Sequence, residues 1–468
     1  MCSLVSFNLP QTAGAQPSSL TVLHAFAGWP NDGANPMGDL ILSGNTLYGV
    51  TLQGGPGFVV GAGSVFKADI GGSSFTNLYF FSATNGWGPD YLSLSGDTLY
   101  GVTGLGGTNS SGVLFALSTN GSGFTDLYTF GPQTYNQNLE ETNANGAGPD
   151  CLAICSNTLY VTVSAGTTNT AGAVFSLNTN GTNLTNVCDF PAGTAGNVIG
   201  GAIGPKIILS GNTLFGTTIG NSYYPPGGQP ITSYGGIFRV DTDGSSFTNL
   251  YTFTNGEDGS MPVAAVTLAG NILYGTAATG GSGSNGTVFS IHTDGSGFTT
   301  LHAFANSDGC IPWCALTLSG NALYGATAEG GSSGAGTLFR INTDGSGFTN
   351  LYVFTALQGQ ANSDGASPEA NLILCGNTLY GIATQGGESG WGTLFAFSLP
   401  LPQLGIASVN GQQSISWPAW AANFNLQKAS TFCGNWTDVT NGVTSSGENY
   451  TVTLNTASPT VFFRLALH

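Results

Sequence analysis

Basic residues are scarce in this sequence, which narrows the kinds of partner that it fits. Its 468 residues include six Lys and Arg against 23 Asp and Glu, and the formal net charge is −17 at pH 7. Nucleic acids and anionic membrane surfaces bind clustered cations, so the composition argues against both as partners. A glycan, a neutral polymer or a cation is compatible with so acidic a chain.

A membrane-spanning run is also missing. No apolar stretch approaches the roughly 18–20 residues that cross a bilayer, so we expect no membrane insertion. Residues 1–17 hold an apolar piece followed by Ala13-Gly14-Ala15, with no basic residue before it. Small residues after an apolar piece are typical of a secretory cleavage site, so we interpret 1–17 as a signal-peptide remnant or a disordered start. The sequence therefore predicts a secreted, extracellular or cell-surface protein, which we expect to be a monomer.

A glycine-rich tandem repeat fills most of the chain. The 74 glycines follow no collagen-like period, so we interpret them as turn residues between many short strands. The phrase LYG or a close variant begins at Leu47, Leu99, Leu159, Leu214, Leu273, Leu323 and Leu379. The phrase G-x-(V/L/I)-F ends at Phe66, Phe115, Phe175, Phe238, Phe289, Phe339 and Phe395. A phrase of the type LYxF ends at Phe26, Phe81, Phe130, Phe190, Phe253, Phe304 and Phe354.

One unit, residues 315–354, indicates the structure of the repeat. Alternating segments predict strands at 315–319, 322–328, 337–343 and 348–354, and turn signals separate them. No segment of the unit has helical periodicity. Four antiparallel strands joined by hairpins and repeated seven times predict an all-β protein, a seven-bladed β-propeller. A β-solenoid is the alternative, although it would need shorter and more uniform coils.

The seventh unit lacks a fourth strand of its own, because the chain continues after residue 399 into Pro-Leu-Pro. The segment 20–26 near the start of the chain carries the missing fourth-strand phrase. We therefore expect 20–26 to complete the seventh blade beside 371–399, which would tie the first and last blades together. The predicted propeller spans residues 18–399.

The units resemble the GloVer-type tandem repeat of secreted bacterial proteins. The matching phrases are GNTLYG, then GG, then GTLF, then DGSGFTNLYVF, and the fourth unit matches least well. The resemblance covers residues 20–399; it implies export and a propeller-like fold, and it implies no particular reaction. Residues 400–468 look like the small β-sandwich module (Ig/Fn3-like) often appended to such proteins, with an expected core of Trp417, Phe424, Leu426, Trp436 and Phe463.

The loops expected on one face of the propeller carry candidate binding residues. A D-G-x-x-P phrase begins at Asp32, Asp258, Asp308 and Asp364. These carboxylates form either a ring that holds sugar hydroxyls or a cation, or turns in which Asp caps backbone N–H groups. Aromatic residues there suit sugar rings, although they also suit loop packing; they are Trp29, Trp87, Trp313, Trp391, Tyr135, Tyr223, Tyr224 and Tyr234. We predict a glycan or another cell-surface ligand on this face, no cofactor, and Ca²⁺ as the alternative occupant of the carboxylates.

Catalysis is the less favoured hypothesis. The four histidines lie outside the predicted loops, so a Ser-His-Asp triad or a His-ligated metal site lacks its central residue. Of the cations, only Lys206 is expected to approach the central channel. A carboxylate pair of the glycoside hydrolase type remains as the enzymatic alternative, with the candidates Asp39, Asp90, Asp150, Glu369, Glu140 and Glu141. The three hypotheses are a non-catalytic binding protein, a carboxylate-dependent glycosidase and a purely structural surface protein.

Overall fold

The computed structural model describes the chain as an all-β protein. The described residues are 19–56, 61–132, 134–135, 141–142, 146–165, 172–190, 206–220, 222–223, 231–400, 402–409, 412–418, 421, 424–429, 437–446, 449–454 and 462–467. Within these ranges the regular secondary structure consists of strands alone. The predicted signal-peptide remnant, residues 1–17, lies outside them.

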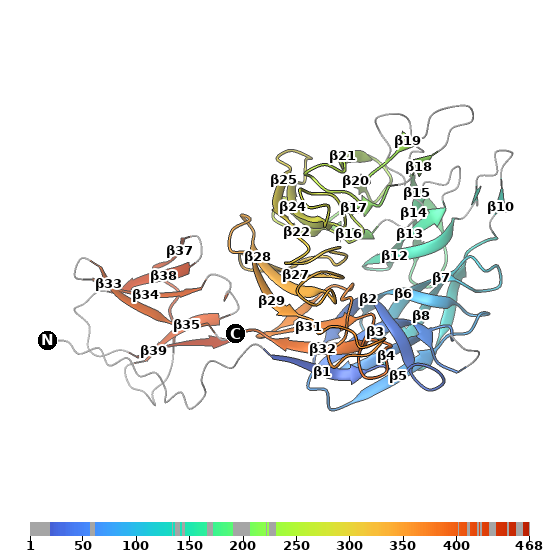
Figure 1. Cartoon of the computed structure of the whole chain (residues 1–468). Coiled ribbons are helices and arrows are strands. Elements are labelled where there is room, and N and C mark those ends of the chain that lie inside the picture. Colours follow the sequence, from blue (N-terminus) through green and yellow to red (C-terminus); the bar gives the residue numbers. More distant parts are fainter. Residues whose placement is uncertain are drawn as a thin grey trace.

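Six four-stranded antiparallel sheets follow one another along the chain (Figure 1). The first three are β2(Gly33–Ser43), β3(Thr46–Gly54), β4(Ser64–Asp69) and β5(Phe75–Phe80); β6(Trp87–Ser95), β7(Thr98–Leu105), β8(Val113–Ser118) and β9(Thr125–Thr129); and β12(Ala147–Cys155), β13(Thr158–Ala165), β14(Ala173–Asn178) and β15(Thr185–Asp189). The next three are β16(Lys206–Ser210), β17(Thr213–Thr218), β20(Gly236–Asp241) and β21(Thr248–Thr252); β22(Thr267–Ala269), β23(Ile272–Ala277), β24(Thr287–His292) and β25(Thr299–Ala303); and β26(Thr317–Ser319), β27(Ala322–Thr327), β28(Thr337–Asn342) and β29(Thr349–Val353). Two-stranded hairpins lie between β9 and β12 and between β17 and β20; they are β10(Thr134–Tyr135) with β11(Glu141–Thr142) and β18(Ser222–Tyr223) with β19(Ile231–Thr232).

A further four-stranded sheet, here called the shared sheet, combines the two ends of the repeat region. Its order is β1-β32-β31-β30, formed by β1(Ser19–Ala25), β32(Thr393–Ser398), β31(Thr378–Ala383) and β30(Ile373–Cys375). Leu20 pairs with Phe397 and Val22 with Phe395. The predicted pairing of 20–26 with 393–399 is therefore present, and Figure 1 shows the blue β1 lying beside the orange β32.

The repeated phrases LYG and G-x-(V/L/I)-F meet across the second and third strands of each sheet. Gly49 pairs with Phe66 and Gly381 with Phe395, and the other sheets keep the same register. A Cβ atom at either glycine would lie 2.5 Å from the Cζ atom of its phenylalanine. The glycine therefore makes room for the buried ring, because a side chain there would overlap it. One sheet departs from this rule, since Val161 pairs with Phe175.

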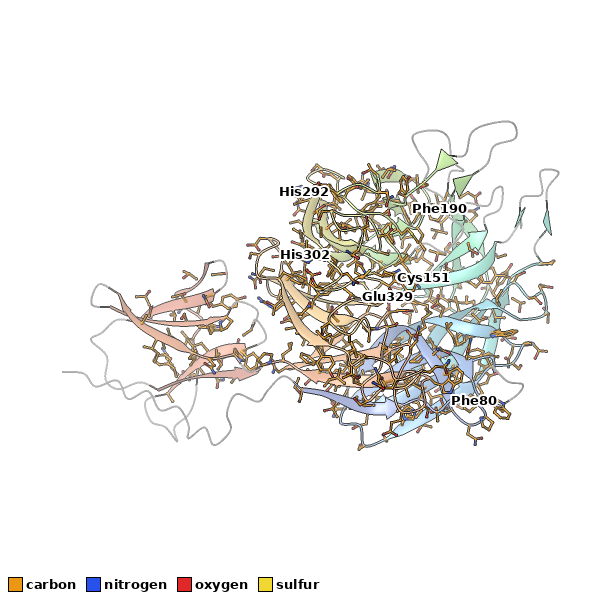
Figure 2. All side chains as sticks on the ribbon, viewed as in Figure 1. Phe80, Cys151, Phe190, His292, His302 and Glu329 are labelled. Carbon is orange, nitrogen blue, oxygen red and sulfur yellow. The ribbon has the colours of Figure 1, made fainter. Side chains whose placement is uncertain are left out.

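Side chains fill the space around and between the strands (Figure 2). Seven hydrophobic clusters lie between neighbouring sheets. One of them joins Phe26 and Leu394 of the shared sheet to Leu40 and Phe66 of the β2–β5 sheet. The Phe26 and Phe66 ring centroids lie 5.3 Å apart in an edge-to-face arrangement. The shared sheet therefore packs on the sheet that follows it in the sequence as well as on β26–β29.

Residues 405–467 form two smaller sheets, which lie beside the others in Figure 1. Their orders are β33-β34-β38-β37 and β36-β35-β39, from β33(Gly405–Val409), β34(Gln412–Pro418), β35(Phe424–Ala429), β36(Thr437–Asp438), β37(Val443–Ser446), β38(Asn449–Leu454) and β39(Phe462–Leu467). The two sheets share one core, in which Trp417, Phe424 and Leu426 are buried as predicted and Phe463 packs at the margin. Trp436, the other predicted core residue, lies outside the described residues.

Candidate functional site

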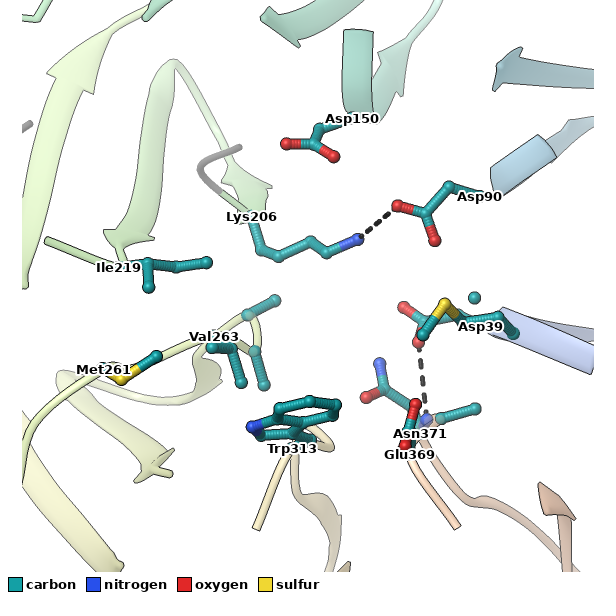
Figure 3. Close-up of a pocket in the computed structure, with 15 residues that line it drawn as sticks. Asp39, Asp90, Asp150, Lys206, Ile219, Met261, Val263, Trp313, Glu369 and Asn371 are labelled. Carbon is teal, nitrogen blue, oxygen red and sulfur yellow. Dashed lines mark hydrogen bonds and ion pairs between the residues drawn. The ribbon is translucent and has the colours of Figure 1, made fainter. Parts of the chain in front are cut away.

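A pocket of about 250 Å³ lies where the first strands of the seven repeat sheets converge (Figure 3). We call it the central pocket. The strands β2, β6, β12 and β16 contribute Met37, Gly38, Asp39, Asp90, Asp150 and Lys206, and Ile219 follows β17. The segments that lead into β22, β26 and β30 contribute Met261, Val263, Ala264, Ala265, Trp313, Glu369, Ala370 and Asn371. Each of the seven sheets thus supplies part of the wall.

One side of the central pocket is polar and carries most of its charge. Asp39, Asp90, Asp150 and Glu369 lie along this side, and the Lys206 side chain extends toward Asp90 (Figure 3). The Lys206 Nζ atom lies 3.6 Å from the Asp90 Oδ2 atom, and both side chains are 23% exposed. The Asn371 backbone N–H donates to the Asp39 Oδ1 atom at 3.4 Å.

Burial and neighbouring charges shift the pKa values of these groups. Burial raises the pKa of Glu369 to about 7, and Glu329 adds to the shift while a bond from Thr384 opposes it. Burial also raises the pKa of Asp39. Burial alone would lower the pKa of Lys206, but the charges around it, with Asp90 first, raise it. The pocket therefore holds a charged lysine at neutral pH, and the pKa of Glu369 lies near neutral pH as well.

The opposite side of the central pocket is apolar. Ile219, Met261, Val263 and Trp313 line it, and Figure 3 shows Trp313 across from Asp90 and Asp150, with Glu369 beside the indole. Trp313 and Met261 are each 37% exposed. An indole face can pack on the C–H surface of a ligand while carboxylates accept hydrogen bonds from its hydroxyl groups. The wall thus pairs an apolar surface with hydrogen-bond acceptors.

The local sequence of β2 brings Asp39 and Asp90 to the same pocket. Gly38 has φ +71°, and a Cβ atom there would lie 1.9 Å from the Asp90 carbonyl oxygen. The β2–β3 register also shifts between Met37 and Ile41. Such bulges redirect side chains. Only glycine permits this approach of β2 to β6, because any side chain would meet the β6 backbone and be strained as well.

The four aspartates of the D-G-x-x-P phrase lie elsewhere, and each interacts with its own turn and with the strand before it. The Asp258 carboxylate accepts hydrogen bonds from the Tyr251 hydroxyl at 3.1 Å and from the Thr254 N–H at 2.8 Å. The Asp364 carboxylate accepts bonds from the Tyr352 hydroxyl and the Thr355 N–H. Their bonding matches the turn interpretation, and none of the four lines the central pocket.

Histidine replaces tyrosine at two of these turns. The Asp32 Oδ2 atom lies 2.9 Å from the His24 Nε2 atom, and the Asp308 Oδ2 atom lies 3.2 Å from the His302 Nε2 atom. Burial alone would raise the pKa of Asp32, but hydrogen bonds from His24, Ala27 and Asn77 lower it. The four carboxylates therefore already have interaction partners within the protein. Their predicted contact with a ligand stays a prediction.

Replacing Asp364 with alanine tests that role. We expect Asp364→Ala to lower the free energy of unfolding by about 1–3 kcal/mol, because the half-buried Tyr352 hydroxyl and the Thr355 N–H lose their acceptor, the buried Asp364 carboxylate. Ligand binding by the folded variant should be unchanged. Denaturant titration and binding measurements on one preparation check both statements, with the exposed turn variant Asp344→Ala as control. A binding loss without a stability loss would assign Asp364 to the ligand instead.

The predicted tryptophans separate into different places. Trp313 lines the central pocket, whereas Trp391 lines a second cavity. Trp29 and Trp87 are 53% and 44% exposed and line neither. Tyr234 packs at the edge of a cluster between two sheets. The side chains of Tyr135, Tyr223, Tyr224, Glu140 and Glu141 lie outside the described part of the chain.

Metal-ligand clusters and membrane-spanning helices are both absent from the described residues. No three His, Cys, Asp or Glu side chains there are arranged to hold a metal ion. In the same part of the chain, no helix has the length and apolar character needed to span a bilayer.

The sheets and the central pocket define an all-β protein of tandem four-stranded units with a site at their convergence. The sequence matches the Gloeobacter/Verrucomicrobia repeat over residues 7–147, 134–317 and 225–451. The chain therefore belongs to this repeat family. A search of curated proteins found no match.

Solved structures resemble the chain only weakly. The computationally designed Ika8 protein matches with 12% identity and a TM-score of 0.42, over 81% of this chain and 99% of that one. A nidogen/laminin complex matches with 12% identity and a TM-score of 0.38, over 63% and 91% of the two chains. TolB from Acinetobacter baumannii matches with 15% identity and a TM-score of 0.37, over 63% and 60%.

Proposed function

We propose that residues 18–399 form a closed seven-bladed β-propeller, that residues 400–468 form an appended β-sandwich, and that the protein binds a glycan outside the cell. Three observations support the closed ring. β1 completes the shared sheet. A hydrophobic cluster joins that sheet to β2–β5. All seven sheets contribute to the central pocket. On this proposal the central pocket is the mouth of the propeller channel.

The two-sided wall of the central pocket is the observation that carries the binding function. A sugar ring has apolar C–H faces and polar edges, and the pocket sets the Trp313 indole across from Asp90 and Asp150, with Glu369 beside it. The volume of about 250 Å³ suits one small unit of a ligand. The scarcity of basic residues and the extracellular expectation from the sequence agree with a glycan ligand. We also propose that the protein is secreted or held at the cell surface as a monomer.

A glycan array followed by calorimetry tests the proposal. We expect the protein to bind at least one neutral glycan, and Trp313→Ala to weaken that binding at least tenfold, about 1.4 kcal/mol. Leu105→Ala removes an apolar side chain that is 59% exposed and lies outside the pocket, so it serves as control. Trp29→Ala tests whether an exposed tryptophan outside the pocket also contributes to binding. Equal affinity of Trp313→Ala and the unaltered protein would refute the site.

A second candidate function, glycoside hydrolysis, is favoured by one observation. Glu369 has a pKa of about 7, as a general acid requires, while Asp90 is paired with Lys206 in the same pocket. Glycosidases use one protonated and one ionised carboxyl group. Release of reducing ends from any bound glycan, lost in Glu369→Gln, would favour this function over binding alone.

A further inference from the structure

A second cavity, of about 220 Å³, lies beside Trp391, and we call it the amide pocket. Three segments build it. The first part of β2 contributes Asn35, the segment between β29 and β30 contributes Leu357 and Gln360, and the β31–β32 loop contributes Gln385 and Trp391. Two neighbouring sheets, β2–β5 and the shared sheet, thus meet at this cavity.

The framework of the amide pocket is fixed by backbone contacts. The Asn35 N–H donates to the Trp391 carbonyl at 2.9 Å, and the Asn35 side-chain amide donates to the Thr384 carbonyl at 3.2 Å. The Trp391 ring packs on Gly28, where a Cβ atom would lie 3.0 Å from the indole. Trp391 is nevertheless 38% exposed. The indole is therefore held in place with part of its surface open.

The chemistry of the amide pocket selects a neutral ligand. Its described lining includes the amides of Asn35, Gln360 and Gln385, one indole and one leucine, and none of these side chains ionises. Gln360 and Gln385 are exposed, and in the described part of the chain neither amide group is held by a hydrogen bond. Primary amides both donate and accept hydrogen bonds, as hydroxyl groups do. An aromatic face with such amides suits a saccharide unit.

One strand connects the amide pocket to the central pocket. Asn35 lines the first and Met37–Asp39 line the second, and both belong to β2. Asn35 and Met37 lie about 6–7 Å apart along the strand, from its rise per residue. The Thr384 backbone carbonyl accepts the bond from the Asn35 side chain, and the Thr384 side chain also acts on the pKa of Glu369 in the central pocket. The two cavities are therefore close enough for one short oligomer to reach both.

We infer that the amide pocket and the central pocket are two subsites of one surface that binds a neutral oligosaccharide. This inference rests on the proposed glycan function and specifies its substrate class: a chain of several units rather than a single sugar or a terminal charged group. Trp391 and the two glutamines would hold one unit, while Trp313 and the carboxylates hold another.

The test is the dependence of affinity on chain length. The probes are neutral gluco-, manno- and galacto-oligosaccharides of one to six units, measured by calorimetry on the full chain. We expect the unaltered protein to gain at least about tenfold in affinity between one unit and the longer chains, because the second contact becomes intramolecular. Trp391→Ala and Gln385→Ala should lose this gain and keep the affinity for a single unit.

A matched control comes from the repeat itself. Gln53 precedes Gly54-Gly55 as Gln385 precedes Gly386-Gly387, yet it lines neither cavity. Gln53→Ala should therefore keep the full gain with length. If affinity is independent of length, or if Trp391→Ala keeps the gain while Trp313→Ala abolishes binding, the second subsite is wrong and glycan binding stands. If no oligosaccharide binds, or if only peptides bind, both proposals fail.

Discussion

Replacing Phe26 with alanine is expected to lower the free energy of unfolding by about 3–5 kcal/mol, the usual cost of removing a buried aromatic ring. Phe26 follows β1 and is 1% exposed. Its N–H donates to the Gly392 carbonyl at 3.0 Å, and its ring packs on Phe66 and Phe75 of the next sheet. The ring thus packs the N-terminal strand of the shared sheet against the sheet that follows it in the sequence.

Thr21→Ala is the control, because Thr21 lies in the same strand with an exposed side chain. Its effect should stay within about 0.5 kcal/mol. Denaturant titration measures both variants, and amide hydrogen exchange should show faster exchange in β32 for Phe26→Ala alone. If the two variants lose equal stability, β1 adds little to the junction and the closed ring loses its main support.

Replacing Lys206 with methionine is expected to destabilise the protein by about 2–4 kcal/mol at pH 7. Removal of one partner from a buried ion pair leaves the other charge uncompensated. Lys206 contacts Asp90, and the charges of Asp150 and Asp39 also act on it. The expected loss is smaller than for a fully buried pair because both side chains of the Lys206–Asp90 pair are 23% exposed.

The loss in Lys206→Met should depend on pH in a definite direction. Without the lysine, the folded-state pKa values of the pocket carboxyl groups rise above their unfolded values. A raised carboxyl pKa makes protons bind more tightly to the folded state, so the variant gains relative stability as the pH falls. The difference from the unaltered protein should therefore be large at pH 7 and shrink toward pH 4.

Lys67→Met provides the matched comparison for this experiment. Lys67 lies on β4 and, among the described residues, forms no ion pair. Its replacement should cost little at either pH. Denaturant titrations of both variants at pH 4 and pH 7 make the comparison, and a pH-independent loss for Lys206→Met would mean that packing of the lysine stem, and not its charge, is what stabilises the pocket.

Most of the strand pattern could be predicted from the sequence because the repeat is built on side-chain alternation and hairpin turns. The predicted strand 322–328 corresponds to β27, and 337–343 corresponds to β28. The pairing of 20–26 could be predicted as well. The seventh unit lacks a fourth-strand phrase, and 20–26 carries the one such phrase that precedes the first unit. First strands were less predictable: β2 spans 11 residues but β22 only 3, although their units read alike.

The candidate site was only partly predictable. The polar side of the pocket was predictable as a set of candidates because these residues lie in or just before the first strands; they are Asp39, Asp90, Asp150, Glu369 and Lys206. The apolar wall was missed, although Met261 and Val263 precede their first strand much as Glu369 and Asn371 do. The D-G-x-x-P aspartates drew attention by recurrence, but recurrence also marks a turn that four of the units share. The position of a residue in the repeat predicts the loop or strand on which it lies. The direction of its side chain depends also on bulges such as that after Met37.

The position of β1 also bears on how the chain acquires its structure during synthesis. Ser19 pairs with Ser398, so β1 is synthesised long before its partner β32. Pairings between such distant segments form slowly, and an unpaired strand edge invites association with other chains in the meantime. In the nascent chain β1 therefore stays unpaired until β32 has been made. We expect Ser19–Ala25 to need protection by a chaperone during that time.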